Sequence, residues 1–186
     1  MSAIAELCRT HTPLAEEDIA IIEDIARHLQ FIADISQADV FIDCPTGKSD
    51  RAVVVAQAAP TTARSLYRSS VVGHLALSSN EPAVLFGLLS GLPVIEHRGI
   101  SQEGTVMQQN VIPIKNGSGA TIGVLIREQD ITEQVEQEKR VELLLETTGQ
   151  LSDTLLGAAM AENQLPSLMH EGMLLVDEND RVRYAN

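Results

Sequence analysis

The feature that most constrains this chain is the stretch 130–163, which predicts one long helix. Asp130 can accept a free N–H at the start of the helix, and Glu133 follows at the spacing of a capping box. Proline is absent from there until Pro166, and strong helix formers fill the interval. Such a helix is roughly 50 Å long, which exceeds the width of a small domain, so we expect it to leave the domain before it.

The second half of this helix carries an apolar seam in which spacings of three and four residues alternate, as they do in a coiled coil. Gly149 and Gly157 each weaken a helix interior by about 1 kcal/mol. We therefore predict a parallel, two-stranded and imperfect coil in a homodimer. The alternative is a helix that packs back on its own domain. The predicted seam consists of Val141, Leu144, Thr148, Leu151, Leu155 and Ala158.

Charge and composition exclude some classes of partner and indicate the cellular compartment. The 186 residues include 26 acidic and 13 basic side chains, for a net charge of −13. Nucleic acid and anionic membranes need a basic surface, so we expect neither as a direct partner. The sequence has no apolar run long enough to cross a bilayer and no signal peptide, and its two cysteines fit a reducing compartment. These features predict a cytoplasmic protein.

The order of elements predicts an α+β fold, with an antiparallel sheet and flanking helices. The sequence Asn116-Gly117-Ser118-Gly119 is a strong hairpin signal, and Pro113 indicates an edge position or an irregular ladder. Predicted helices cover 2–9, 16–36 and 82–89, and predicted strands cover 39–44, 51–58, 94–97, 105–115, 121–127, 173–176 and 181–184; residues 71–77 fit either strand or helix.

Several motifs resemble bacterial sensory domains. Residues 111–114, the Asn116-Gly117 turn and residues 122–126 resemble the closing hairpin of GAF domains. Residues 172–186 resemble the opening of a PAS domain, and residues 72–91 are similar to the N-terminal region of soluble bacterial sensor histidine kinases. The resemblance implies a GAF-like domain at 1–129, a signalling helix at 130–164 and a truncated PAS domain at 165–186.

The same resemblance implies a function. Kinases of this kind continue into a PAS domain and a kinase core, and they phosphorylate response regulators with antiterminator outputs. Their catalytic parts, with ATP and magnesium, would lie beyond Asn186, so we expect no catalytic site and no cofactor in this segment. His170 and Glu171 are a poor phosphoacceptor pair, because Gly172 and the following strand break any helix there.

Candidate binding residues come from the region that, in GAF-like domains, covers one face of the sheet and encloses a ligand. Their polar groups could orient a small molecule in a mostly apolar pocket. In the plainer interpretation Glu81 only caps a helix and the others coat the surface. The histidines show no metal-site spacing, and Gly47-Lys48-Ser49 lacks the first glycine of a phosphate-binding loop. The candidates are Tyr67, Arg68, His74, Glu81, His97 and Gln109.

Two other functions stay open at this point. The chain could be a small metabolite-processing enzyme that uses Glu81, His74 and His97, which requires these side chains to converge in one cleft. It could also be the same sensor module coupled to a cyclic-nucleotide output domain. Relatives suggest both amines and cyclic dinucleotides as the signal, and the residues do not choose between them.

Overall fold

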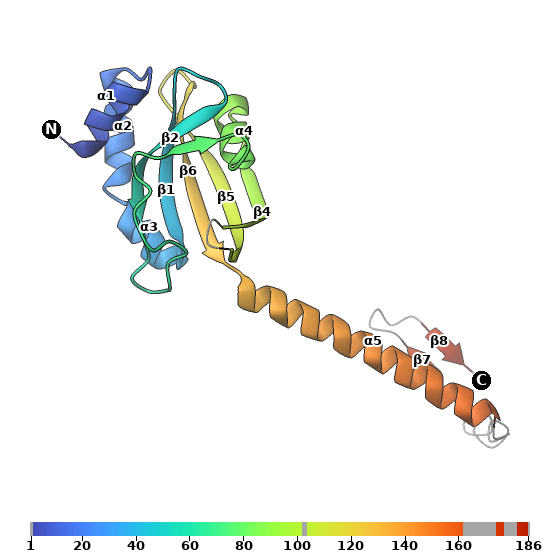
Figure 1. The fold of residues 1–186 in the computed structure, drawn as a ribbon. Coiled ribbons are helices and arrows are strands. Elements are labelled where there is room, and N and C mark those ends of the chain that lie inside the picture. Colours follow the sequence, from blue (N-terminus) through green and yellow to red (C-terminus); the bar gives the residue numbers. More distant parts are fainter. Residues whose placement is uncertain (1, 102–103, 162–173, 177–181, 186) are drawn as a thin grey trace. The chain divides into compact units, whose positions relative to one another are not determined.

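The computed structural model describes residues 2–101, 104–161, 174–176 and 182–185 (Figure 1). Its contacts divide the chain into two units, Met1–Glu133 and Gln134–Asn186. The first unit contains a six-stranded sheet and the second contains most of the last helix and a two-stranded sheet. Each unit is described by itself below.

The sheet of the first unit has the strand order β3-β2-β1-β6-β5-β4. Every neighbouring pair is antiparallel, so the predicted α+β class with an antiparallel sheet is confirmed. The strands are β1 (Asp39–Pro45), β2 (Arg51–Ala58), β3 (Leu75–Leu77), β4 (Val94–Ile100), β5 (Val106–Lys115) and β6 (Thr121–Asp130).

Helices cover both faces of this sheet. The helices α1 (Ala3–His11), α2 (Glu16–Ala26) and α3 (Leu29–Ser36) lie on one face, and α4 (Pro82–Ser90) lies on the other (Figure 1). Side chains alternate between the faces along each strand. In β1, Ile42 packs with α1, α2 and α3, whereas Phe41 packs with α4.

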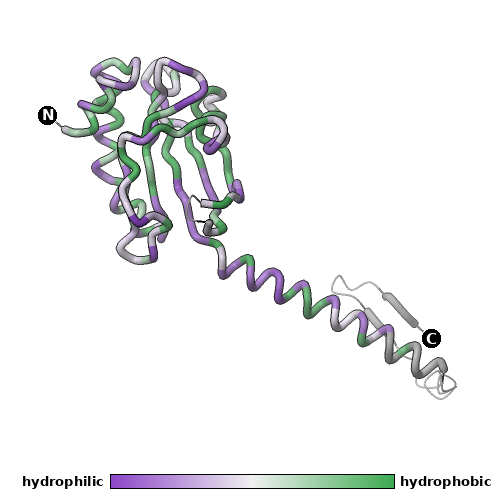
Figure 2. The backbone as a smooth tube through the Cα atoms, viewed as in Figure 1, coloured by the Kyte–Doolittle hydropathy of each residue, from purple (hydrophilic) through white to green (hydrophobic). Residues whose placement is uncertain are grey.

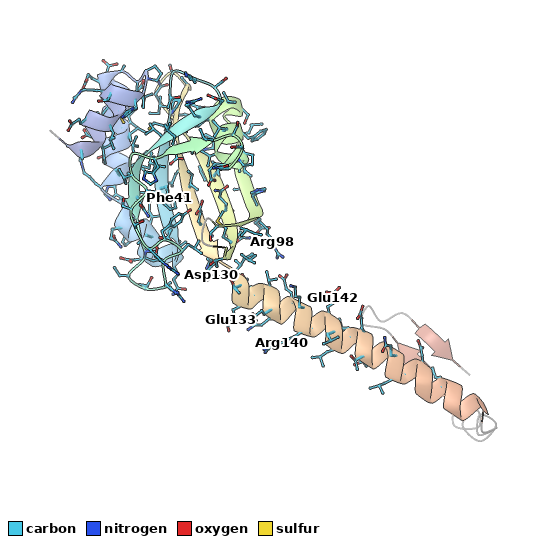
Figure 3. The ribbon with its side chains drawn as sticks, viewed as in Figure 1. Phe41, Arg98, Asp130, Glu133, Arg140 and Glu142 are labelled. Atoms are coloured by element: carbon cyan, nitrogen blue, oxygen red, sulfur yellow. The ribbon has the colours of Figure 1, made fainter. Side chains whose placement is uncertain are left out.

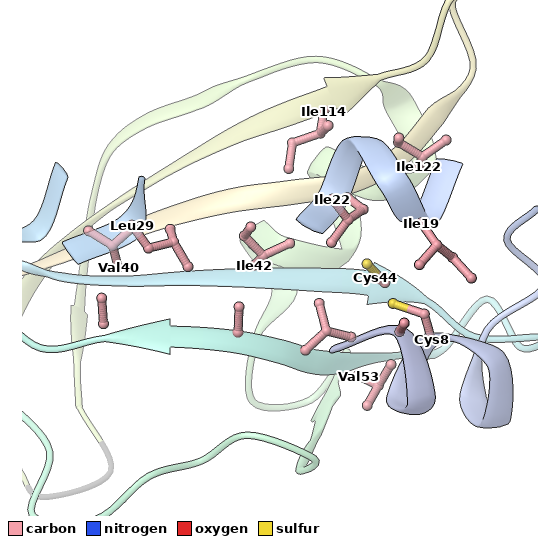
Figure 4. Packing of buried hydrophobic residues seen from close by; sticks show 14 of the residues in the cluster. Cys8, Ile19, Ile22, Leu29, Val40, Ile42, Cys44, Val53, Ile114 and Ile122 are labelled. Atoms are coloured by element: carbon pink, nitrogen blue, oxygen red, sulfur yellow. The ribbon is translucent and has the colours of Figure 1, made fainter. Parts of the chain in front are cut away.

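The core under α1 and α2 is aliphatic and tightly packed (Figure 4). Cys8 of α1 and Cys44 of β1 are both fully buried there, and their sulfur atoms face each other in Figure 4. Gly123 of β6 allows α2 to approach, because a Cβ atom at this position would lie 3.1 Å from the Cδ1 atom of Ile22. This face of the sheet is therefore filled by side chains.

The prediction of one helix over 16–36 is wrong. The chain makes two helices, and a tight turn at Arg27 and His28 separates them. The His28 N–H donates to the carbonyl of Ile25, three residues back, which replaces the α-helical bond. No proline or glycine marks the break, and for this reason the periodic apolar stripe did not reveal it.

Other boundaries also differ from the prediction. Residues 71–77 contribute only the short strand β3, and β4 extends three residues further than predicted, to Ile100. Strand β6 continues to Asp130 instead of ending at residue 127. Pro113 stands in an interior strand, but β4 pairs with β5 only as far as Val111, so one side of β5 has no neighbouring strand at the proline.

The long helix α5 covers Thr132–Ala161. Asp130 Oδ1 accepts the Thr132 N–H at 2.8 Å, so the carboxylate satisfies a free donor at the start of the helix, although the helix begins two residues after Asp130 and the predicted bond from Glu133 stays a prediction. Figure 2 shows a hydrophilic first part of α5, and Figure 3 labels Glu133, Arg140 and Glu142 on it. Among the described residues no helix is both long and apolar enough to cross a membrane.

The predicted coil seam lies on α5, and its pairing with a second copy stays a prediction. Val141, Leu144 and Leu151 are exposed, with 56%, 66% and 59% of their surface accessible, and Thr148 is exposed as well. The side chains of Leu155 and Ala158 lie outside the described part, as do His170 and Glu171.

The second unit ends in a short hairpin. Strand β7 (Leu174–Val176) pairs antiparallel with β8 (Val182–Ala185). The strands lie close to the expected positions, and their assignment to a PAS domain stays a prediction.

Candidate functional site

A cavity of about 60 Å³ lies in the first unit, on the face of the sheet that carries α4. Strands β1, β2, β3 and β6, the start of α4 and the loop after β2 enclose it. Its walls combine apolar side chains with an unusual number of polar ones. The polar groups are Asp43, Tyr67, His74, Asn80, Glu81 and Glu128.

A row of polar residues crosses the sheet beside this cavity. Asp39 of β1 pairs in register with Glu128 of β6, Glu128 with Gln109 of β5, and Gln109 with His97 of β4. Two acidic residues thus lie directly opposite each other on neighbouring strands, an arrangement that is unfavourable when both are charged. Hydrogen bonds to these carboxyl groups, or protonation of one of them, must therefore offset the repulsion between the two acids.

Gln109 joins two of the carboxyl groups. Its Nε2 atom donates to Glu81 Oε2 at 3.0 Å and to Glu128 Oε1 at 2.8 Å. An amide nitrogen has two N–H donors, and these bonds use both of them. Glu81 precedes α4 as its N-cap but makes no capping bond, so the plainer interpretation of Glu81 as a helix cap is not what the structure shows.

Hydrogen bonds to Asp39 and Glu128 of the same row hold the loop after β2 against the cavity. Tyr67 Oη donates to Glu128 Oε2 at 2.6 Å, and Asp39 accepts from Ser65 Oγ and from the Leu66 N–H, both at 2.7 Å. The Tyr67 ring also meets Phe41 edge to face, with 5.2 Å between the ring centroids. Phe41, labelled in Figure 3, and Tyr67 together form an aromatic wall of the cavity.

Asp43 is the least satisfied polar group in the site. It is 2% exposed, and its Oδ1 atom has no hydrogen-bond partner among the described residues. Burial, reinforced by the charges of Glu81 and Glu128, raises the pKa of Asp43 to about 8. A buried carboxyl without a partner is costly, so this atom marks a place where a donor is missing.

The neighbouring carboxyl groups are also shifted toward their neutral forms. Burial raises the pKa of Glu128 to about 7, although the bonds from Tyr67 and Gln109 oppose the shift. Burial likewise raises the pKa values of Glu81 and Asp39. Acids with raised pKa values that line a cavity are candidates for a functional site.

The structure brings most of the predicted binding residues together. Tyr67, His74 and Glu81 line the cavity, and Gln109 lies directly behind two of its carboxyl groups. His97 is exposed at the end of the polar row and does not line the cavity. Arg68 is exposed and lines a separate surface depression with Gln57 and Ser70.

Sequence reasoning missed Phe41, Asp43 and Glu128. Two acids in the otherwise apolar stretch 39–44 were the available signal, since a buried strand rarely carries charges. Glu128 was missed because the predicted strand ended at residue 127, three residues before the end of β6.

The enzyme hypothesis requires Glu81, His74 and His97 in one cleft, and His97 does not line the cavity that Glu81 and His74 share. Among the described residues no hydrogen bond joins any two of Glu81, His74 and His97, and Gln109 is the partner of Glu81. The described residues also contain no group of three or more His, Cys, Asp or Glu side chains that could hold a metal ion.

Comparisons with known proteins agree with this fold. Residues 4–148 match the family described as histidine kinase PdtaS, GAF domain. A solved structure described as the sensor region of a sensor histidine kinase is similar over 100% of this chain, with 24% identity and a TM-score of 0.55. The present chain spans 65% of the length of that chain. A comparison with curated proteins returns no match.

Two further solved structures are more distant. A sensory box histidine kinase/response regulator from Burkholderia thailandensis has 13% identity and a TM-score of 0.42, covering 66% of this chain and 98% of its own. The GAF domain of an Acinetobacter phosphoenolpyruvate-protein phosphotransferase has 16% identity and a TM-score of 0.42, covering 88% and 99%.

Proposed function

The chain belongs to the family of histidine kinase PdtaS GAF domains, and from this premise we propose that it senses a small molecule for a sensor histidine kinase. The observation that carries the proposal is the cavity, which is lined by the buried Asp43 and Glu128 and the half-buried Glu81, and in which one oxygen of Asp43 has no partner among the described residues. A sensor needs a site at which ligand binding changes the free energy of the folded protein. A buried oxygen without a partner is such a site, because a ligand that donates a hydrogen bond to it removes an energetic cost.

The signal would leave the cavity through β6. Glu128 lines the cavity, and two residues later Asp130 holds the first turn of α5. Ile131, between Asp130 and the helix, is 3% exposed and its N–H donates to Val106 of β5. A ligand that moves Glu128 therefore acts on the residues that fix the start of the helix.

The relay would then use a dimer. Two copies of α5 pair along the seam Val141, Leu144, Thr148 and Leu151, and the polar Thr148 and the nearby Gly149 keep that pairing weak. A weak coil can adopt two packings of similar energy, and a ligand shifts their populations by its difference in affinity for the two. The PAS domain and the kinase core would follow.

The parent protein would be a cytoplasmic histidine kinase that uses ATP and magnesium in its own core. Its partners would be response regulators with antiterminator outputs, as in the kinases that the sequence resembles. This segment would contribute recognition and relay and no catalytic group.

A screen for ligands with a cavity-filling variant tests the sensing function. Ala76 lines the cavity and is 7% exposed, so Ala76→Leu places extra carbon atoms in it, while Ala20→Leu adds the same atoms on the exposed face of α2. A metabolite at 100 times its dissociation constant stabilises the folded state by about 2.7 kcal/mol. We expect at least one compound to raise the melting temperature of the wild type and of Ala20→Leu but not of Ala76→Leu. Equal responses in all three proteins, or none, would contradict the proposal.

A further inference from the structure

We propose that the cavity binds a small organic cation whose ammonium group lies among the carboxyl groups of Asp43, Glu81 and Glu128. This inference rests on the proposed sensing function and extends it by naming the chemical class of the ligand. Four observations support it, namely the convergence of the acids, the unsatisfied oxygen, the aromatic wall and the size of the cavity.

Three carboxyl groups from three different segments converge on one space. Asp43 comes from β1, Glu128 from β6 and Glu81 from the start of α4, and all three line the cavity. Asp43 and Glu128 are only 2% and 3% exposed. No lysine or arginine lines the cavity with them, so the described walls offer no permanent positive charge to offset theirs.

The hydrogen bonds leave acceptors open toward the cavity. Gln109 donates its two amide hydrogens to Glu81 and Glu128, and Tyr67 donates its hydroxyl hydrogen to Glu128. Asp43 Oδ1 receives nothing from the described residues although it is buried. A primary ammonium group has three N–H donors and carries the opposite charge, so it can donate to Asp43 and satisfy this oxygen while its charge is offset by the neighbouring carboxyl groups.

The remaining walls suit the rest of such a ligand. The rings of Phe41 and Tyr67 stand at one side, and an aromatic face attracts a cation. Val54, Ala76 and Val84 provide apolar surface for a short alkyl chain. The cavity therefore combines a negative end with a small apolar volume.

The same features exclude other classes of ligand. A water molecule needs roughly 10–15 Å³ of such volume, so a cavity of about 60 Å³ holds a ligand of about four to six non-hydrogen atoms and no nucleotide. An anion would meet three acidic side chains. A bare metal ion lacks a suitable set of ligands among the described residues.

Binding should also release protons, because a cation favours the ionised acids. Burial holds the pKa of Asp43 near 8 and that of Glu128 near 7, so both are partly protonated at neutral pH. The other titratable groups that face this cluster are Asp39 on β1, Tyr67 on the loop, His74 before β3 and His97 on β4.

Three probes of similar size, with four or five non-hydrogen atoms, and of different charge test the inference. They are n-propylammonium, n-propanol and propionate, each titrated at millimolar concentrations into the ¹⁵N-labelled chain while amide resonances are recorded. We expect only n-propylammonium to shift the resonances of residues around the cavity. Calorimetry in two buffers of different ionisation enthalpy should show proton release on binding.

Matched variants identify the site. Asp43→Asn should weaken binding of n-propylammonium at least about tenfold, the effect of losing one charge-assisted hydrogen bond in a buried place. Glu17→Gln removes the same charge from an exposed position of α2 and should bind as the wild type does. The amide resonances also report whether Asp43→Asn is folded, so a loss of binding is not confused with unfolding.

The outcomes separate this inference from the proposed function. If n-propanol or propionate shifts the same resonances as strongly as n-propylammonium, the cavity is a binding site but the cationic class is wrong. The same conclusion follows if none of the probes binds while the metabolite screen finds a ligand that Ala76→Leu abolishes. If Asp43→Asn binds n-propylammonium as tightly as Glu17→Gln does, the assigned position of the ammonium group is wrong.

Discussion

Glu128 and Asp130 stand two positions apart on β6, and they connect the cavity to the first turn of α5. Glu128 accepts the Tyr67 hydroxyl inside the site at 2.6 Å, while Asp130 accepts the Thr132 N–H at 2.8 Å. One continuous strand carries both side chains, and it pairs with β1 as far as Glu128 and with β5 as far as Asp130.

The buried Asp43 should make the domain less stable as the pH rises. Its pKa is about 8 in the folded protein and about 3.9 in an unfolded chain, so the folded state binds more protons between these values. The free energy of unfolding then falls with rising pH, by at most about 1.4 kcal/mol per pH unit for this proton. Asp43→Asn should flatten the dependence and raise the stability at pH values near 8, as measured by urea unfolding.

Glu17→Gln is the control for that experiment, since Glu17 is exposed and lies away from the cavity on α2. It should leave the slope of stability against pH unchanged. An Asp43→Asn protein with the slope of the wild type would show that Asp43 is ionised in the folded state, and that its oxygen has a partner.

Tyr67 should hold the pKa of Glu128 down. The Tyr67 hydrogen bond favours the charged carboxylate and opposes the effect of burial. Tyr67→Phe should therefore raise the pKa of Glu128 above its value of about 7, as followed by the ¹³C chemical shift of its carboxyl group.

Ser65→Ala is the matched change for this prediction. Ser65 donates to Asp39 at 2.7 Å and makes no bond to Glu128, so its loss should raise the pKa of Asp39 and leave that of Glu128 nearly in place. If both variants shift Glu128 equally, the loop as a whole sets its pKa and the Tyr67 bond does not.

If α5 pairs along the predicted seam, substitutions of two adjacent leucines should affect the dimer dissociation constant very differently. Leu144 lies on the seam and Leu143 lies off it, although they are similarly exposed on α5, at 66% and 62%. Leu144→Asp would remove about 1.5 kcal/mol or more of burial in each subunit, or about a hundredfold in the dimer dissociation constant. Leu143→Asp should change it little.

Sedimentation equilibrium of the two variants measures this difference directly. Equal weakening by both would place the interface elsewhere on α5. A wild-type chain that stays monomeric at micromolar concentration would remove the dimeric relay from the proposal.

Much of the sheet could be predicted, because alternation and turn signals are local properties of the chain. The Asn116-Gly117-Ser118-Gly119 turn and the strands around it were placed within a few residues. The break at Arg27 and His28 could not be predicted, since it replaces one backbone hydrogen bond and changes no feature of the apolar pattern. Tertiary packing decides such details.

The candidate site was predicted only in part, for a similar reason. The sequence marks Tyr67, Glu81 and Gln109 as polar residues of a region expected to cover the sheet. The row from Asp39 through Glu128 and Gln109 to His97 depends on strand register, which brings together residues far apart in sequence. Only the pairing of β1 with β6 shows that Asp39 and Glu128 are opposed.

Hydrogen exchange with and without n-propylammonium tests the central claim, that a ligand in the cavity acts on the start of the long helix. We predict slower exchange of the amides of Val124–Asp130 and of the first turn of α5 from Thr132 when the probe is bound to the wild type, and no change in Asp43→Asn. Saturation of the cavity that leaves exchange at Asp130 and Thr132 unaltered would contradict the relay.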